Sequence, residues 1–155
     1  MKRLYTVFVM MAVAAMSLIS CEKYEDGKPL KNVRDVFAEM YPNARDVEWD
    51  WDITCWNVSF ELGSYPGVKE CEAWYDMDAN WIRTETDIFA SALPQSVKDA
   101  LAASEYASAA IDARDIDYVE TPEGNFYKLD MNFKGVEIKL KVSEDGLVSM
   151  VGVDF

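Results

Sequence analysis

The chain has 155 residues, half of them apolar, and a formal net charge of −13 at pH 7. This acidic balance argues against nucleic acid and anionic membrane surfaces as ligands, because their phosphates are bound by Lys and Arg. The sequence has no histidine, so the commonest general base and the commonest zinc ligand are missing. Carboxylate pairs could still do acid–base chemistry, but no pair stands out among so many acidic residues. We therefore expect no enzyme activity, no catalytic residues, no metal site and no cofactor.

Residues 1–20 have the pattern of a lipoprotein signal peptide. Two basic residues precede an apolar run over 4–19, and small residues lead into Cys21. A membrane-spanning helix needs about 20 apolar residues and usually a basic flank on its far side, whereas acidic residues follow here. We expect cleavage before Cys21, lipid on its thiol and a place in the cell envelope, in the periplasm or at the outer membrane; an uncleaved anchor is the alternative. The mature chain of 135 residues (155 − 20) suits one domain.

Residues 21–28 are polar and aperiodic, and we expect them to be a tether between the lipid and the fold. After Pro29, apolar residues including Val33 and Phe37 recur at helical spacing, and Pro42 ends the predicted helix. We expect this helix to cover a sheet.

Three strands and a tight turn are predicted next. Residues 46–53 alternate acidic and apolar side chains, which is the strongest strand signal in the chain. Further strands are expected over 56–62 and 68–75, and a turn at 78–80 leads into a return strand from Trp81. Trp49, Trp51 and Trp56 are expected to fill the core.

The second half repeats this order. Pro94 introduces a helix with Val97 on its buried face, residues 113–118 match residues 44–49, and alternating strands follow to the C-terminus. This predicts an α+β fold of two repeats, 29–91 and 92–155, in one domain over 29–155. Each repeat is a helix followed by three or four antiparallel strands, with the helices packed on one face of the sheet. Besides Val33 and Val97, the residues expected to be buried are Phe37, Trp56, Phe60, Tyr127, Leu129, Ile138 and Leu140.

Four motifs in this order resemble the PepSY-like family, which is also described as β-lactamase-inhibitor-like. They are a helix ending in Tyr-Pro at 41–42, Ala-Arg-Asp-Val-Glu-Trp at 44–49, Trp-Asn-Val-Ser-Phe at 56–60, and the turn at 75–81. The resemblance covers about residues 29–155. It implies a β-lactamase-inhibitor-protein-like fold, export, often as a lipoprotein, and a binding or inhibitory module without catalytic residues. The chain departs from the family in having Ala79 where the turn usually has glycine.

Two smaller features have competing interpretations. Asp76, Asp78 and Asn80 have the spacing of a calcium loop, but Trp81 stands where that loop requires glycine, so we interpret the segment as a hairpin turn. Cys55 and Cys71 lie on adjacent predicted strands in an oxidising compartment, which permits a disulfide. Alternation places the two side chains on opposite faces, which favours a buried, free Cys71. The pattern leaves both states of the cysteines open.

The sheet face turned away from the first helix is expected to be strongly acidic. No Lys or Arg falls at its predicted positions in the first half, and Trp74, which alternates with Ala73 and Tyr75, is expected to emerge there as a hot spot. We predict that this face binds an unidentified basic protein or peptide, with inhibition as one form of that function. Alternatives are a solvated surface without a partner, or a binder or sensor of a small ligand, glycan or cation. The candidate partner-binding residues are Glu48, Asp50, Asp52, Glu70, Glu72 and Trp74.

Overall fold

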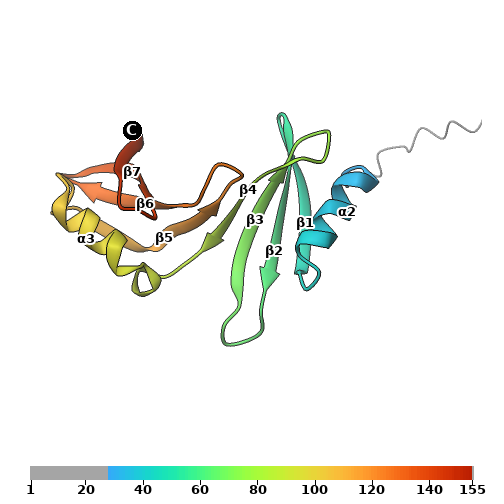
Figure 1. The fold of residues 1–155 in the computed structure, drawn as a ribbon, viewed down its shortest axis with the longest axis horizontal. Coiled ribbons are helices and arrows are strands. Elements are labelled where there is room, and N and C mark those ends of the chain that lie inside the picture. Colours follow the sequence, from blue (N-terminus) through green and yellow to red (C-terminus); the bar gives the residue numbers. More distant parts are fainter. Residues whose placement is uncertain (1–27, 155) are drawn as a thin grey trace, which may run out of the picture.

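The computed structural model describes residues 28–154, and within this range a helix and four strands are followed by a second helix and four strands (Figure 1). The first half consists of α2 (Lys31–Met40), β1 (Arg45–Asp52), β2 (Cys55–Leu62), β3 (Lys69–Tyr75) and β4 (Trp81–Asp87). The second half consists of the short 3-10 helix η1 (Ala90–Ala92), α3 (Gln95–Ala103), β5 (Ala110–Glu120), β6 (Phe126–Phe133), β7 (Val136–Ser143) and β8 (Val148–Asp154). The predicted signal peptide, Cys21 and the tether up to residue 27 lie outside the described residues.

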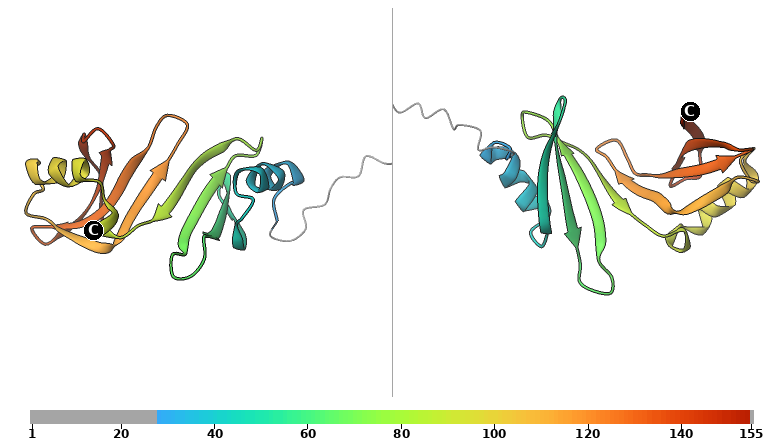
Figure 2. Two further views of the ribbon diagram at one scale, coloured as in Figure 1. Left: turned by 60° about the horizontal axis from the view of Figure 1, so that its bottom comes forward. Right: turned by 180° about the vertical axis from the view of Figure 1, so that it is seen from behind.

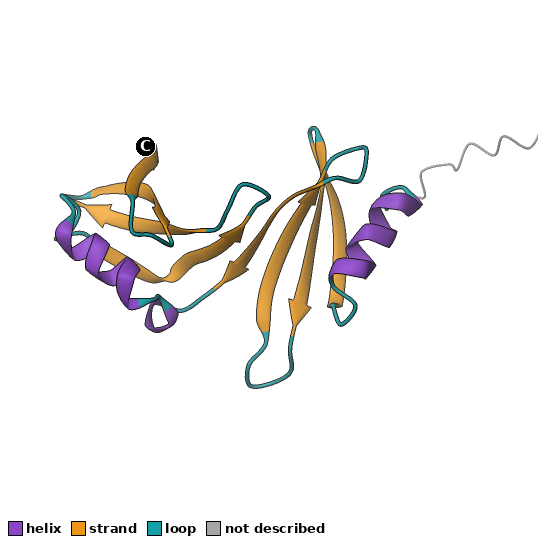
Figure 3. Ribbon diagram, in the orientation of Figure 1, coloured by secondary structure: helices purple, strands orange, loops and turns teal. Residues whose placement is uncertain are grey.

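The eight strands form one sheet in chain order, and every neighbouring pair is antiparallel. Figure 3 shows the strands as one strongly twisted layer, with α2 near the β1 end and α3 beside the strands of the second half. The predicted α+β class, an antiparallel sheet with two helices, is confirmed. In the part of the chain that the structure describes, no helix has the length and apolar character needed to cross a bilayer.

One face of the sheet carries the core of both halves. Phe60 pairs with Cys71, Cys71 with Thr86, Thr86 with Tyr118 and Tyr118 with Tyr127, and directly paired side chains point to the same face. The apolar side chains on this face gather into two clusters, one with the buried residues of α2 and one with those of α3. The residues predicted to be buried are confirmed: Val33, Phe37, Trp56, Phe60, Val97, Tyr127, Leu129, Ile138 and Leu140 are all at most 8% exposed.

The prediction that Trp51 fills the core is wrong. Trp56 is buried and Trp49 is half-buried against Phe37, whereas Trp51 remains 42% exposed. Its ring packs edge-on against Trp56, with 5.0 Å between the ring centroids. The physical reason is that β1 is the outermost strand of the sheet, so that within residues 28–154 no further strand covers Trp51 on that side.

The predicted hairpin turn after β3 is confirmed. One carboxylate oxygen of Asp76 accepts hydrogen bonds from the backbone amides of Asp78, at 2.9 Å, and Asn80, at 2.8 Å, while the other accepts the Asn80 side-chain amide at 2.8 Å. These bonds, chiefly that of the Asn80 side chain, lower the pKa of Asp76. Ala79 adopts the left-handed conformation, with φ of 67°. The carboxylate of Asp76, which would be the first ligand of a calcium loop, therefore already accepts hydrogen bonds within the turn.

A polar contact inside the first half holds β4 against the end of α2. The Tyr41 hydroxyl lies 2.5 Å from the Thr84 hydroxyl oxygen, to which the Trp81 indole N–H donates at 2.8 Å. Thr84 is buried. Since strand side chains alternate between faces, fixing Thr84 toward the helix directs its neighbours Arg83 and Glu85 to the opposite face.

Candidate partner-binding face

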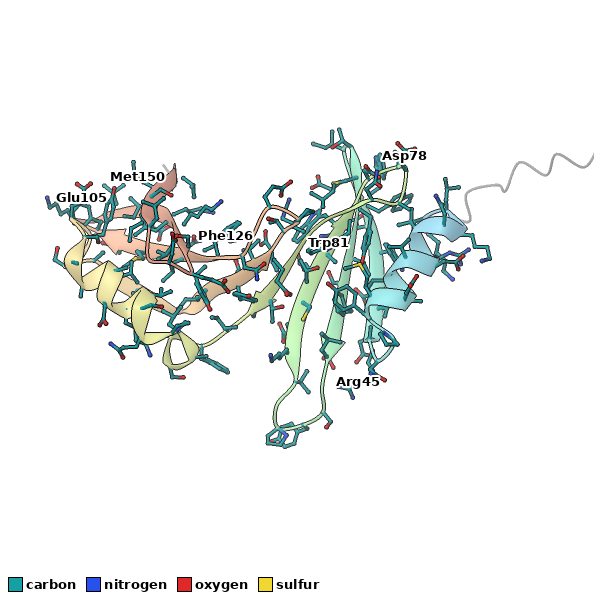
Figure 4. All side chains as sticks on the ribbon, viewed as in Figure 1. Arg45, Asp78, Trp81, Glu105, Phe126 and Met150 are labelled. Carbon is teal, nitrogen blue, oxygen red and sulfur yellow. The ribbon has the colours of Figure 1, made fainter. Side chains whose placement is uncertain are left out.

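The sheet face opposite the two core clusters is rich in carboxylates. Glu48, Asp50 and Asp52 of β1 pair with Ser59, Asn57 and Cys55 of β2, while farther across the sheet acidic residues pair directly with one another: Glu61 with Glu70, Glu72 with Glu85, and Asp87 with Asp117. Figure 4 shows how densely side chains cover the strands, and the labelled Arg45 at the start of β1 reaches Glu61 at 3.4 Å. We call the following set the acidic face: Glu48, Asp50, Asp52, Glu61, Glu70, Glu72, Glu85, Asp87 and Asp117.

The middle of the acidic face is hollowed. A cavity of about 550 Å³ lies over the strands from β1 to β6. Its lining comprises Asp46, Ser59, Phe60, Glu61, Glu70, Cys71, Glu72, Glu85, Asp87, Asp117 and Lys128. Seven carboxylates therefore surround one ammonium group, which gives the hollow a negative potential suited to a cationic group. Among the described side chains, no group of three or more potential ligands is arranged to hold a metal ion.

A chain of ion pairs crosses the hollow from the first half to the second. Arg83 Nε lies 2.8 Å from Glu85 Oε1, Glu85 Oε2 lies 2.5 Å from Lys128 Nζ, and Lys128 Nζ lies 2.7 Å from Asp117 Oδ2. Burial lowers the pKa of Lys128, but the hydrogen bonds and charges of Asp117 and Glu85 outweigh it and the net shift is upward. Lys128 is thus held charged by carboxylates of both halves.

Four of the seven carboxylates that line the hollow, Asp46, Glu70, Glu72 and Asp87, have no ion pair within residues 28–154, and two of them lie on β3. Within residues 28–154, neither Glu70 nor Glu72 has a cationic partner within 4.0 Å. Glu72 accepts only a long hydrogen bond, 3.5 Å, from the Asn57 side chain. The acidic face can therefore bind additional positive charge at β3, because Arg83 and Lys128 already form ion pairs with Glu85 and Asp117.

Asp87 and Asp117 face each other where the two halves join. Burial, followed by the hydrogen bond and charge of Asp117 and the charges of Glu70 and Glu72, raises the pKa of Asp87 to about 6. The negative charge of the hollow therefore grows as the pH rises through this value.

We expect Asp87→Asn to change how stability depends on pH. The folded-state pKa of Asp87 lies above its ordinary value of 3.8, so the folded state binds more protons and stability is lost as the pH rises from about 4 to about 7. Wild type should lose stability relative to the variant over that range. The difference should stay under about 1 kcal/mol, because Asp87 is only partly buried and solvent screens the exposed part of its carboxylate. Urea unfolding at both ends of the range measures it, with Glu105→Gln as control, and identical profiles for wild type and Asp87→Asn would contradict it.

Of the predicted binding residues, the structure places two in the hollow. Glu70 and Glu72 line it, whereas Glu48, Asp50 and Asp52 lie on the same face at the sheet edge, outside the lining.

The sixth predicted residue, Trp74, lies on the predicted face but is not an exposed hot spot. It is only 6% exposed, and the Arg83 guanidinium carbon lies 3.7 Å from its ring centroid. The pairing of β3 with β4 sets Arg83 directly opposite Trp74. The predicted positions on the first three strands carry no Lys or Arg, but β4, which the prediction did not include, brings Arg83 to this face.

The contribution of β4 to the acidic face was not predicted from the sequence. Arg83, Glu85 and Asp87 alternate with Thr84 and Thr86, which point to the core side. The same alternation rule that was applied to the earlier strands would have placed these three charges on the acidic face. What it could not have supplied is their partners, which depend on strand neighbours.

Cys55 and Cys71 are both free. Cys71 is buried on the core side, where its sulfur lies 3.5 Å from the Thr86 hydroxyl oxygen, and Cys55 pairs with Asp52 on the other face. Burial raises the pKa of both thiols, which favours the unreactive protonated form. The two side chains therefore lie on opposite faces of the sheet, as alternation along the strands predicts, and form no disulfide.

The fold and this face together define a class of protein: an antiparallel sheet with two helices, in which the charged face of the sheet is the candidate binding surface. Residues 55–149 match the family described as "Putative beta-lactamase-inhibitor-like, PepSY-like", and the chain belongs to this PepSY-like family. The family is described as inhibitor-like rather than by a catalysed reaction. The predicted resemblance is confirmed.

Solved structures from Bacteroides species have the same fold. A BLIP-like protein of Bacteroides fragilis is 25% identical, with a TM-score of 0.68, and the alignment covers 82% of this chain and 86% of that one. A DUF2874 family protein of Bacteroides ovatus is 21% identical, with a TM-score of 0.69 and coverage of 80% and 89%. A protein of Bacteroides eggerthii described as periplasmic is 20% identical, with a TM-score of 0.67 and coverage of 83% and 89%. None of the curated proteins matches the sequence.

Proposed function

We propose that this protein is a non-enzymatic lipoprotein of the cell envelope that binds a basic protein or peptide through its acidic face. The observation that carries the proposal is the pair of uncompensated carboxylates, Glu70 and Glu72, in the hollow. Like charges on neighbouring strands destabilise a sheet, and dispersed acidic residues would provide solubility without that cost. A cationic surface docked here would supply the missing counter-charges. The inhibitor-like description of the family makes inhibition of the partner the form of binding to test first.

The character of the hollow supports a macromolecular partner over a small ligand. Small-molecule sites are mostly apolar cavities with a few polar groups, whereas charged side chains dominate this lining. A small cationic ligand is the second candidate, because several carboxylates converge on the same space. Competition between a captured partner and such a ligand would place both in the hollow.

The proposal also covers the repeat architecture and the cellular location of the protein. We infer that residues 29–91 and 92–155 are two copies of one unit, since each holds a helix followed by four strands. The periplasmic description of the Bacteroides eggerthii structure supports an envelope location. The lipobox pattern before Cys21 supports attachment through a lipid, on the outer membrane or in the periplasm.

We expect Cys21→Ala to prevent lipidation and to release or mislocalise the protein, because the thiol is the only anchor once the apolar segment is removed. Detergent phase partitioning and membrane fractionation of cells measure the change. A conservative substitution within the tether, Lys23→Arg, is the control and should partition like wild type. A Cys21→Ala protein that stays with membranes as wild type does would contradict the lipid anchor.

The binding proposal is tested on a partner captured from envelope extract with the purified protein. We expect affinity to fall steeply with salt and to fall further in Glu70→Gln/Glu72→Gln, because both changes weaken attraction to the basic surface. The matched control, Glu39→Gln/Glu105→Gln, removes the same charge from exposed sites away from the acidic face and should bind like wild type. Affinity that ignores salt and the first pair of substitutions would overturn the proposal.

A further inference from the structure

We propose that β1 is a receiving edge, at which an extended segment of the partner pairs with residues 48–52 and continues the sheet. The segment would alternate Lys or Arg with apolar side chains. This inference rests on the proposed function for the basic character of the partner, and adds where and how the partner binds. Strand addition of this kind takes affinity from main-chain hydrogen bonds and specificity from alternate side chains.

The outer edge of β1 is open. Among the described elements β1 pairs only with β2, and seven of its eight residues are solvent-exposed. The backbone amide of Trp51 donates to the Asp50 carboxylate at 2.7 Å, which shows that this amide faces outward. In an antiparallel pair, inward and outward backbone groups alternate every residue, so Trp49 also presents its backbone to the open edge. The Trp51 amide would exchange its bond to Asp50 for one to an added strand, and such rows of outward donors and acceptors are templates for another strand.

The two faces of β1 specify the chemistry of the added strand. Glu48, Asp50 and Asp52 lie on the acidic face, while Trp51 lies 42% exposed on the other face, beside Trp56. Side chains of an added strand alternate between the same two faces. Opposite charges on adjacent strands attract, so the residues beside the three carboxylates should be cationic and those beside Trp51 should be apolar.

Charge also selects between the possible occupants. A second copy that paired through its own β1 would bring Asp50 and its neighbours against the same carboxylates, which is destabilising. A basic segment would instead supply counter-charges to a strand whose three carboxylates have no ion pair within the described residues. The geometry therefore favours a heterologous basic strand.

The test uses a capped peptide of about ten residues that alternates Lys and Val. It is titrated into the purified protein and compared with two N-methylated forms, one methylated at every Lys amide and the other at every Val amide. All three peptides carry the same charge and side chains. Because successive N–H groups of a strand point to opposite edges, only one of the two methylated forms loses the N–H groups that would face β1. We expect that form to bind at least about tenfold more weakly, since each lost hydrogen bond changes affinity about two- to tenfold.

A matched pair of protein variants tests the same contact from the other side. Trp51→Pro and Trp51→Ala both remove the ring, but only proline removes the outward amide, and edge strands tolerate proline at such positions. We expect Trp51→Pro to bind the parent peptide about two- to tenfold more weakly than Trp51→Ala. The amides of Trp49 and Trp51 should also exchange hydrogen more slowly when the parent peptide is bound. Should Trp51→Pro not fold, the methylated peptides and hydrogen exchange still decide.

Three outcomes overturn the inference. If all peptides bind equally and lose affinity in Glu70→Gln/Glu72→Gln, strand addition is wrong although the acidic face binds cations as proposed. If the parent peptide does not bind, the receiving edge is wrong, while the captured partner still tests the acidic face by itself. If the protein self-associates and Trp51→Pro abolishes this, the occupant is a second copy and not a basic segment.

Discussion

Replacing Phe37 by alanine is expected to lower the free energy of unfolding by about 3–5 kcal/mol. The side chain is 6% exposed and joins α2 to the sheet. Its ring centroid lies 5.3 Å from that of Trp49, 5.1 Å from Phe60 and 6.4 Å from Tyr75. Removing the ring leaves a cavity between rigid aromatic groups that cannot collapse, so both the transfer free energy and the cavity term are lost. A domain of ordinary stability, about 5–15 kcal/mol, would be close to unfolding.

Urea unfolding of wild type and Phe37→Ala measures this loss. Glu39→Ala, on the exposed side of the same helix, is the control and should change stability by less than about 0.5 kcal/mol. A loss below about 1 kcal/mol for Phe37→Ala would mean that the contact between α2 and the sheet contributes little to the fold.

The second large effect is expected at Trp74. Because the ring is 6% exposed and covered by the Arg83 guanidinium, Trp74→Ala should reduce stability by about 3 kcal/mol, at the low end for a buried aromatic residue. The low end applies because a flexible arginine can partly fill the space. The substitution also frees Arg83, which now neutralises Glu85 at 2.8 Å. A loss of partner affinity in this variant would therefore report the displaced arginine as well as the missing ring.

Trp51→Ala is the control for Trp74→Ala, because it removes the same kind of ring from an exposed site. Trp51 is 42% exposed at the sheet edge, so its removal should cost much less stability than removal of Trp74. Unfolding curves of the two variants under the same conditions give the difference. If Trp74→Ala were nearly as stable as wild type and yet lost affinity for a captured partner, Trp74 would be an accessible hot spot after all.

Much of the architecture follows from alternation in the sequence. The alternating apolar positions of residues 56–60, 127–131 and 138–142 predict one buried sheet face, and helical spacing predicts the contacts of Val33 and Val97; these side chains are buried, whereas Val136 at the start of β7 is 44% exposed. The same rule assigns Glu70 and Glu72 to the opposite face, where they line the hollow. These predictions succeed because the orientation of a side chain in a strand or helix depends on local backbone geometry.

The surroundings of each side chain did not follow from the same rule. Exposure of Trp51 depends on β1 lying at the edge of the sheet that the described strands form, and burial of Trp74 depends on Arg83 lying opposite it. The spacing of apolar residues within a single segment predicts neither of these two contacts. The prediction of which residues share this sheet face is therefore confirmed, whereas the prediction that Trp74 is an exposed hot spot is wrong.

The sequence by itself determined the strand faces, the helix contacts and the acidic character of one surface, because these depend on residue order within single elements. Only the tertiary structure decided that Lys128 of β6 joins Glu85 of β4 to Asp117 of β5, and that β1 is an edge strand among the strands of residues 28–154. Ion pairs and edges are properties of strand order and register, which bring together residues far apart in the chain. Register is set by the packing of the whole sheet, and that is why the carboxylates without an ion pair within residues 28–154 could be identified only from the three-dimensional structure.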